Sequence, residues 1–152
     1  MHPPAVRVPN SRAHIVPSLI RPRICHFTDH ASKIYLVFGT SNHWAPMVVN
    51  KSVERIFIHD PLSNLVQPQH AKQVLEFLSA VTGDLAYLSY SVDIARSIPK
   101  QTDGRSCGVF ACVILYHLMT GAKMGFAQKD IPSWRKFIAG KIYELWDAGY
   151  AE

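Results

Sequence analysis

A cysteine stands at the start of a long apolar run, and the residues just before it are polar. Cys107 opens the stretch Cys-Gly-Val-Phe-Ala-Cys-Val-Ile-Leu, and Gln101 lies upstream of it in the loop Gln-Thr-Asp-Gly-Arg-Ser. If the apolar run is a helix, its first N–H groups and its dipole favour the thiolate of Cys107, which is a strong nucleophile. A loop that folds back would aim the Gln101 amide and the Cys107 N–H at one point. Such a pair of donors forms an oxyanion hole for acyl transfer.

A cysteine nucleophile needs a base, and the base needs a group that orients it. His43 begins one predicted strand, and Asp60 ends the next one. Because adjacent antiparallel strands bring such ends together, Asp60 is expected to hold the His43 imidazole in the correct tautomer. His59 is a rival base. In a regular strand it points to the face opposite Asp60, so we prefer His43.

The elements that must position these residues follow from hydrophobic periodicity. Three short strands joined by short loops predict an antiparallel meander, and helical spacing of apolar residues with a following glycine predicts helices. The expected strands are 33–38, 43–50 and 55–60. The expected helices are 67–82, 107–119 and a last one that Asp130 caps and Gly149 closes. Residues 87–98 are expected to be extended, and residues 99–106 are expected to form a loop. The segment 107–119 is apolar on nearly every side, which predicts a buried central helix. The fold class is therefore α+β: a small antiparallel sheet packed on a central buried helix with flanking helices.

Composition limits the classes of protein that the chain can belong to. The 152 residues are 48% hydrophobic and 18% charged, which is typical of one globular domain. Residues 1–32 are expected to form a basic Pro/Arg-rich lead-in, and residues 33–152 to form the domain. No apolar run has the length of a membrane span, and the N-terminus has no secretory signal pattern. An odd number of cysteines, three, favours a reducing compartment, the nucleus or the cytoplasm.

Charge and the remaining cysteines suggest partners but no metal. The net charge of +5 would suit an acidic protein partner, although a solvated, loosely ordered arm explains the early arginines better, and no Lys/Arg cluster is dense enough to predict nucleic-acid binding. Cys25, His26 and His30 lack a second pair at the spacing of a zinc site, so we expect no metal and no cofactor. Cys112 lies well inside the apolar segment and is expected to be inert core.

The ordered set of motifs resembles the Ulp/sentrin-type cysteine proteases of the adenain-like clan. The resemblance is carried by His43-Trp44, by Asp60, and by the run from Gln101 to Phe110, and it covers about residues 33–146. The signature is His-Trp, then Asp at a strand end, then Q-x-N/D-x-x-D-C-G-x-F/Y. Ser106 stands where this signature has Asp, and residues 1–32 hold no counterpart of the family's upstream Trp-Leu-Asp-type motif.

The resemblance implies a peptidase that cuts the peptide or isopeptide bond after the C-terminal Gly-Gly of a ubiquitin-like modifier of the SUMO or NEDD8 type. It implies that Cys107 attacks the carbonyl and that His43 serves as base and acid. Asp60 would orient His43, and Gln101 would bind the oxyanion with the Cys107 N–H. The partner would be the modifier and its conjugates, and the enzyme is expected to be monomeric.

The same resemblance implies a site for a slender substrate tail. Trp44 would lie over the Gly-Gly segment and admit only residues without side chains. Gly108 would allow another backbone to approach, and Asp103, which with Gly104 makes a turn, would line the oxyanion site. Two other readings use the same residues: a viral-type endopeptidase or acetyltransferase effector on the same triad, and a non-catalytic module that binds a modifier.

Overall fold

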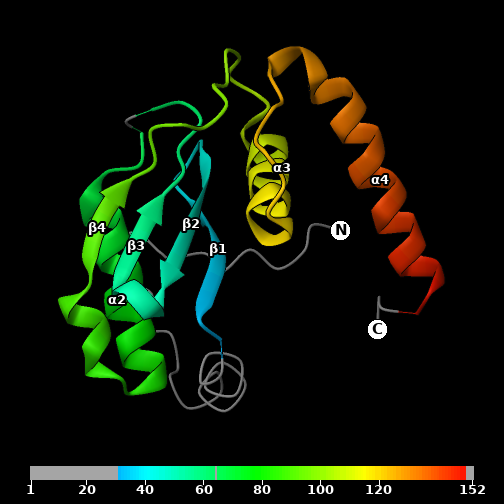
Figure 1. Ribbon diagram of the computed structural model, residues 1–152. Helices are drawn as coiled ribbons and strands as arrows, with labels where there is room; N and C mark the ends of the chain where they lie inside the picture. The colour runs from blue at the N-terminus through cyan, green and yellow to red at the C-terminus, as the bar shows by residue number, and fades with distance from the viewer. Residues whose placement is uncertain (1–30, 64, 150–152) are drawn as a thin grey trace.

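The structure is a computed structural model that describes residues 31–63 and 65–149. Most of the predicted lead-in, together with Cys25, His26 and His30, lies outside these residues. The described elements are strands β1 (Lys33–Gly39), β2 (Trp44–Asn50), β3 (Arg55–Ile58) and β4 (Ser91–Ile94), helices α2 (Pro68–Thr82), α3 (Cys107–Thr120) and α4 (Ile131–Asp147), and 3-10 helices η1 (Lys51–Val53), η2 (Leu85–Ser89) and η3 (Gln128–Asp130). Figure 1 shows them in layers, with α2 on one side of the sheet, α3 on the other and α4 outside α3. None of the described helices is long and apolar enough to cross a membrane.

The sheet has the strand order β1-β2-β3-β4 and is mixed. β1, β2 and β3 pair antiparallel, which confirms the predicted meander, whereas β4 pairs parallel with β3. The parallel pair arises because α2 lies between β3 and β4 in the chain and carries it back across the sheet, as a crossover helix does. The extended segment predicted for 87–98 is wrong over its first part, where η2 forms, and only Ser91–Ile94 is a strand.

The main core lies between the sheet and α2. Alternate residues of β2, namely Ala45, Met47 and Val49, are completely buried there, as the period of two requires. The helix predicted for 67–82 is confirmed as α2, and Gly83 ends it with a φ of 79°. A left-handed backbone of this kind suits glycine, because other residues lack room for their Cβ.

The opposite face of the sheet faces α3. Side chains of the other strand parity, such as Tyr35 and Val48, line a shallow hollow of about 140 Å³ together with Leu118 of α3. Phe110 and Ile114 of α3 are completely buried, as predicted. The prediction for Cys112 is wrong, because this cysteine is exposed. Five residues of helix turn a side chain by about 140°, which carries position 112 away from the side where Cys107 lies.

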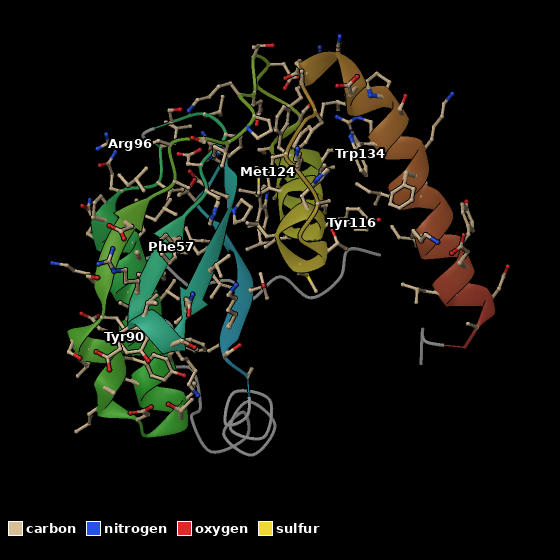
Figure 2. The ribbon with its side chains drawn as sticks, viewed as in Figure 1. Phe57, Tyr90, Arg96, Tyr116, Met124 and Trp134 are labelled. Carbon is tan, nitrogen blue, oxygen red and sulfur yellow. The ribbon has the colours of Figure 1, made fainter. Side chains whose placement is uncertain are left out.

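α4 packs on α3 only along its first half. Figure 2 shows Trp134 of α4 and Tyr116 of α3 at this contact, and their ring centroids lie 5.9 Å apart. His117 and Phe137 belong to the same aromatic cluster. Further along α4 the apolar residues at helical spacing are not covered by the described part of the chain, since Ile142, Leu145 and Trp146 are all more than half exposed.

The start of α4 also differs in detail from the prediction. The helix begins at Ile131 with Pro132 in its first turn. Asp130, however, makes no side-chain cap for it. Its carboxylate accepts a hydrogen bond from the Ala127 N–H at 2.9 Å instead, and so caps the N-terminus of η3.

Candidate active site

A histidine and an aspartate meet at the end of the sheet. His43 precedes β2, and Asp60 follows β3, which ends two residues earlier than predicted, at Ile58. The His59 N–H donates to the Pro46 carbonyl at 2.9 Å, which extends the β2–β3 pairing toward this end. His43 Nε2 lies 2.7 Å from Asp60 Oδ1, and both residues are buried, with exposed fractions of 2% and 3%.

The Asp60 carboxylate is fully occupied by donors. Besides His43, it accepts backbone N–H groups of Leu62, Leu65 and Val66, each at 2.9 Å. Burial alone would raise the pKa of Asp60. The hydrogen bond from His43 and those from Val66 and Leu62 outweigh burial and lower this pKa to about 2. Asp60 is therefore a carboxylate at neutral pH.

The ionised Asp60 fixes the state of the His43 ring. A carboxylate accepts and cannot donate, so His43 Nε2 carries the proton of the neutral ring and Nδ1 carries the lone pair. Nδ1 is buried and has no hydrogen-bond partner within 31–63 and 65–149, so it is not hydrogen bonded to the Cys107 thiol. The ring thus presents a buried basic nitrogen that is free to take a proton.

Cys107 is the first residue of α3 and is 9% exposed. The Phe110 N–H donates to the Ser106 carbonyl at 2.9 Å, so the N–H groups of Cys107 and Gly108 come before the first intrahelical bond. Gly108 is exposed, and a Cβ placed on it would meet nothing within 4 Å. Another chain therefore has room to approach the backbone beside the thiol.

Gln101 is anchored beside the Asp60 turn. Its N–H donates to the Pro61 carbonyl at 3.0 Å, and only 6% of the residue is exposed. Its side-chain Nε2 donates to the Asp103 carbonyl oxygen at 2.6 Å and to Asp103 Oδ1 at 3.2 Å. Backbone and side chain together hold Gln101 between Asp60 and the loop that leads to Cys107.

The Trp44 indole lies against Gly39 of β1, a residue that no motif in the sequence marks. Gly39 pairs with Trp44 in the β1–β2 ladder. A Cβ at Gly39 would come within 2.7 Å of Trp44 Cζ3 and 2.8 Å of Cε3, which real contacts do not allow. The indole therefore depends on glycine at position 39 for its place beside His43.

Sequence reasoning also missed two polar residues that hold the loop before Cys107. Gln128 of η3 accepts the Thr102 N–H on its Oε1 at 2.9 Å. Arg135 of α4 donates from Nη2 to Ser106 Oγ at 3.2 Å. No motif marks either residue, and only the packing of α4 beside this loop brings them there.

His59, the rival base, lies in the hollow between the sheet and α3. It is buried, and burial lowers its pKa by disfavouring the charged ring. Asp60 is bonded to His43 and not to His59.

The fold is similar to that of solved SUMO proteases. A solved structure described as "SUMO protease Ulp1 with the catalytic cysteine oxidized to a sulfonic acid" superposes with a TM-score of 0.70 at 22% identity, over 87% of this chain and 62% of that one. The C-terminal Ulp1 protease domain in complex with Smt3, the yeast orthologue of SUMO, gives 0.64 at 22% identity, over 78% and 56%. The Ulp1-like SUMO protease catalytic domain of Chaetomium thermophilum gives 0.58 at 21%, over 71% and 44%.

These likenesses show the fold, and the chain spans less than two thirds of each of those chains. No curated protein matches the chain. The family model described as "Ulp1 protease family, C-terminal catalytic domain" matches residues 21–150, which is most of the sequence. The chain therefore belongs to the Ulp1 protease family, a family of cysteine proteases.

Proposed function

We propose that this chain is a cysteine protease domain that cleaves the bond after the C-terminal glycine of a ubiquitin-like modifier, with SUMO as the first candidate. The observation that carries the proposal is the buried His43–Asp60 pair, which leaves the lone pair of His43 Nδ1 without a hydrogen-bond partner among the described residues. Family membership and the position of Cys107 at the tip of α3 support it. SUMO comes first because the superposed structures are described as SUMO proteases.

In the first half of the proposed reaction, His43 Nδ1 takes the proton of the Cys107 thiol. The thiolate then attacks the carbonyl carbon of the terminal glycine, and the carbonyl π electrons move onto oxygen. The Cys107 N–H and the Gln101 amide stabilise this oxyanion. When the tetrahedral intermediate collapses, the C–N bond breaks, the amine leaves with the proton from His43, and a thioester remains on Cys107.

In the second half, a water molecule replaces the amine. His43 Nδ1 takes a proton from the water, the hydroxide attacks the thioester carbonyl, and the C–S bond breaks. The thiolate recovers its proton from the imidazolium. Throughout both halves Asp60 stays ionised and stabilises the imidazolium through Nε2.

The test uses the full chain and SUMO that carries a C-terminal propargylamide in place of its last residue. The Cys107 thiol adds across the alkyne, so an S–C bond forms and the proton ends on the neighbouring carbon. We expect a covalent adduct that Cys107→Ala abolishes and that ubiquitin or NEDD8 probes form more slowly. Intact mass and peptide mapping measure the adduct and locate it.

Cys112→Ser is the matched control, because Cys112 is an exposed cysteine on the same helix. It should leave the adduct unchanged. An adduct that survives Cys107→Ala would contradict the assigned nucleophile. A folded protein that binds SUMO but forms no adduct would be a binding module instead.

The role of Trp44 is proposed on steric grounds. We propose that the Trp44 indole covers the approach to Cys107, where it would leave space for a glycine tail and exclude side chains. We expect a SUMO probe whose penultimate glycine is replaced by alanine to react at least about tenfold more slowly, as a clash of this kind costs one or more kcal/mol. Equal rates for both probes would contradict the filter.

A further inference from the structure

The loop before Cys107 is built around one carboxylate. Asp103 Oδ1 accepts the N–H groups of Arg105 at 3.1 Å and Ser106 at 2.9 Å, in addition to Gln101 Nε2. Asp103 Oδ2 accepts Ser106 Oγ at 2.7 Å and Gln128 Nε2 at 2.9 Å. Both oxygens of one side chain thus fix the loop that carries Gln101 at one end and Cys107 at the other.

Asp103 decides which end of the Gln101 amide is the donor end. Gln101 Nε2 faces two acceptors of Asp103, its carbonyl oxygen and Oδ1. The oxyanion role requires that both acceptors share one N–H of Nε2, so that the second N–H stays available for the substrate oxygen. An amide turned by half a rotation would set its own oxygen against both. Gln101 Oε1 is buried and has no partner in the described part of the chain. A buried oxygen without a donor is unfavourable. The amide nevertheless keeps this orientation, because Asp103 accepts hydrogen bonds from its nitrogen.

Ser106 departs from the signature quoted above, whereas Asp103 is one of the two residues that the signature allows at its position. The signature places Asp directly before the cysteine and allows Asn or Asp four residues before it. In the form with Asn, the one negative charge of the pair lies directly before the cysteine. The Ser106 hydroxyl donates to Asp103 Oδ2 and accepts from Arg135 Nη2. In this chain the pair therefore consists of the charged Asp103 and the neutral Ser106.

We propose that Asp103 is the positioning residue of the oxyanion hole, that Ser106 and Gln128 hold its carboxylate, and that positions 103 and 106 work as a pair in which the charge has changed places. Asp103 acts through Gln101 and touches no reacting atom. The inference rests on the proposed function for its kinetic consequence. The geometry of the Gln101 side chain can be tested without any turnover.

The pair predicts an unusual pattern of variants. Asp103→Ala removes the acceptors at Oδ1 and Oδ2, and we expect kcat to fall about 100-fold, as for the loss of one oxyanion donor, while KM stays within about threefold. Ser106→Asp sets two carboxylates in contact and should lower kcat to a similar degree. Asp103→Asn keeps an oxygen for the donors that bind Oδ1, but its NH₂ group would face the Gln128 Nε2 donor without an acceptor between them. We therefore expect kcat to fall by less than about tenfold.

The decisive variant combines Asp103→Asn with Ser106→Asp. The introduced amide can donate to the introduced carboxylate, and Arg135 and Gln128 can donate to that carboxylate as well. We expect the double variant to recover kcat to within about threefold of the parent, although Ser106→Asp alone loses about 100-fold. A double variant as poor as Ser106→Asp alone would overturn the inference.

Two further readouts separate positioning from damage to the fold. Iodoacetamide alkylates Cys107 by displacing iodide, a step with no oxyanion, so its rate at Cys107, resolved from Cys112 by peptide mapping, should be unchanged in Asp103→Ala. The second readout is hydrogen exchange of the Gln101 side-chain NH₂ protons, whose NMR resonance is assigned by its loss in Gln101→Ala. These protons should exchange with solvent at least about tenfold faster in Asp103→Ala, because a hydrogen bond of about 1 kcal/mol or more is lost. Their protection should return in the double variant.

These readouts keep the two proposals apart. If the parent cleaves no modifier, the proposed function fails, and the Gln101 resonance still decides the positioning role. If the parent cleaves SUMO and Asp103→Ala keeps both kcat and the protected resonance, the positioning role is wrong and the proposed function stands. If Asp103→Ala does not fold, the single and double variants that carry Asn at 103 provide the same comparison.

Discussion

The two halves of the candidate site are each built on one carboxylate, and the two carboxylates have different surroundings. Asp60 is 3% exposed and holds one imidazole together with backbone N–H groups. Asp103 lies in a half-buried loop, and its partners are an amide and a hydroxyl of its own loop, two backbone N–H groups, and Gln128. Hydrogen bonds lower the pKa of both to about 2: at Asp60 they outweigh burial, and at Asp103 that from Ser106 is the largest cause.

The difference lies in what each carboxylate holds. The imidazole on Asp60 gains and loses a proton in the proposed reaction, so the negative charge of Asp60 is needed in every step. The groups on Asp103 do not titrate, so its shape and its acceptors matter more than its charge. An asparagine should therefore be tolerated far better at position 103 than at position 60.

Asp60→Asn gives the largest expected effect. The asparagine can donate from Nδ2 to His43 Nε2, which puts the ring proton on Nδ1 and removes the base. We expect kcat for hydrolysis of SUMO aminomethylcoumarin to fall on the order of 10³- to 10⁴-fold. Fluorescence assays on Asp60→Asn and Asp103→Asn, measured side by side, test the contrast directly.

Asp93→Asn is the matched control. The Asp93 side chain is 41% exposed at the sheet edge, where it pairs with Arg55 at 2.8 Å. Exposed pairs of this kind contribute at most about 1 kcal/mol, so activity should not change. A loss of kcat of less than tenfold in Asp60→Asn would show that the charge of Asp60 is not required. The proposed difference between Asp60 and Asp103 would then be wrong.

The part of the site at the sheet, His43 and Asp60, could be predicted from the sequence. The part in the loop from Gln101 to Cys107 could be predicted only partly. His43 and Asp60 end neighbouring strands of a meander, and strand pairing alone predicts that they meet. Gln101 and Asp103 stand in a recognisable motif, but Gln128 and Arg135 reach the loop from η3 and α4. Their contribution depends on tertiary packing that no local pattern encodes.

The same limit explains the errors in the fold. Hydrophobicity on nearly every side predicted that 107–119 is a buried central helix, yet burial depends on which neighbours cover each side, and Cys112 and Met119 are exposed. The parallel strand β4 has only four residues, Ser91–Ile94, which is too short for alternation to distinguish it from a loop. Its pairing depends instead on where α2 returns the chain.

Gln101→Ala tests the loop half at the atom that would contact substrate. Removal of one oxyanion donor should lower kcat about 100-fold with little change in KM, which is less than the loss expected for Asp60→Asn. Single-turnover kinetics with SUMO aminomethylcoumarin separate the chemical step from binding. A Gln101→Ala enzyme with full kcat would mean that the Cys107 N–H suffices, and Asp103 would have nothing to position.

Acid stability sharpens the comparison on the side of Asp60. A carboxyl whose pKa falls from 3.8 to about 2 on folding stabilises the fold above pH 4, and this contribution is lost as the pH falls through about 2. The shift corresponds to about 2 kcal/mol. Urea unfolding of the parent and of Asp60→Asn, between pH 6 and pH 2, should show a difference in unfolding free energy that shrinks in this window. A difference that stays constant with pH would contradict the role of the Asp60 charge.

Gln128→Ala should have the smallest effect, because it removes only the tie between the loop and η3. The Thr102 N–H and Asp103 Oδ2 each lose one partner, while the bonds within the loop remain. A net hydrogen bond contributes about 1 kcal/mol, so we expect kcat to fall between about threefold and tenfold with KM unchanged. Gln73→Ala, at an exposed position of α2, is the control and should show no change. A loss in Gln128→Ala as large as that in Gln101→Ala would place the anchor of the oxyanion loop in η3 rather than in Asp103.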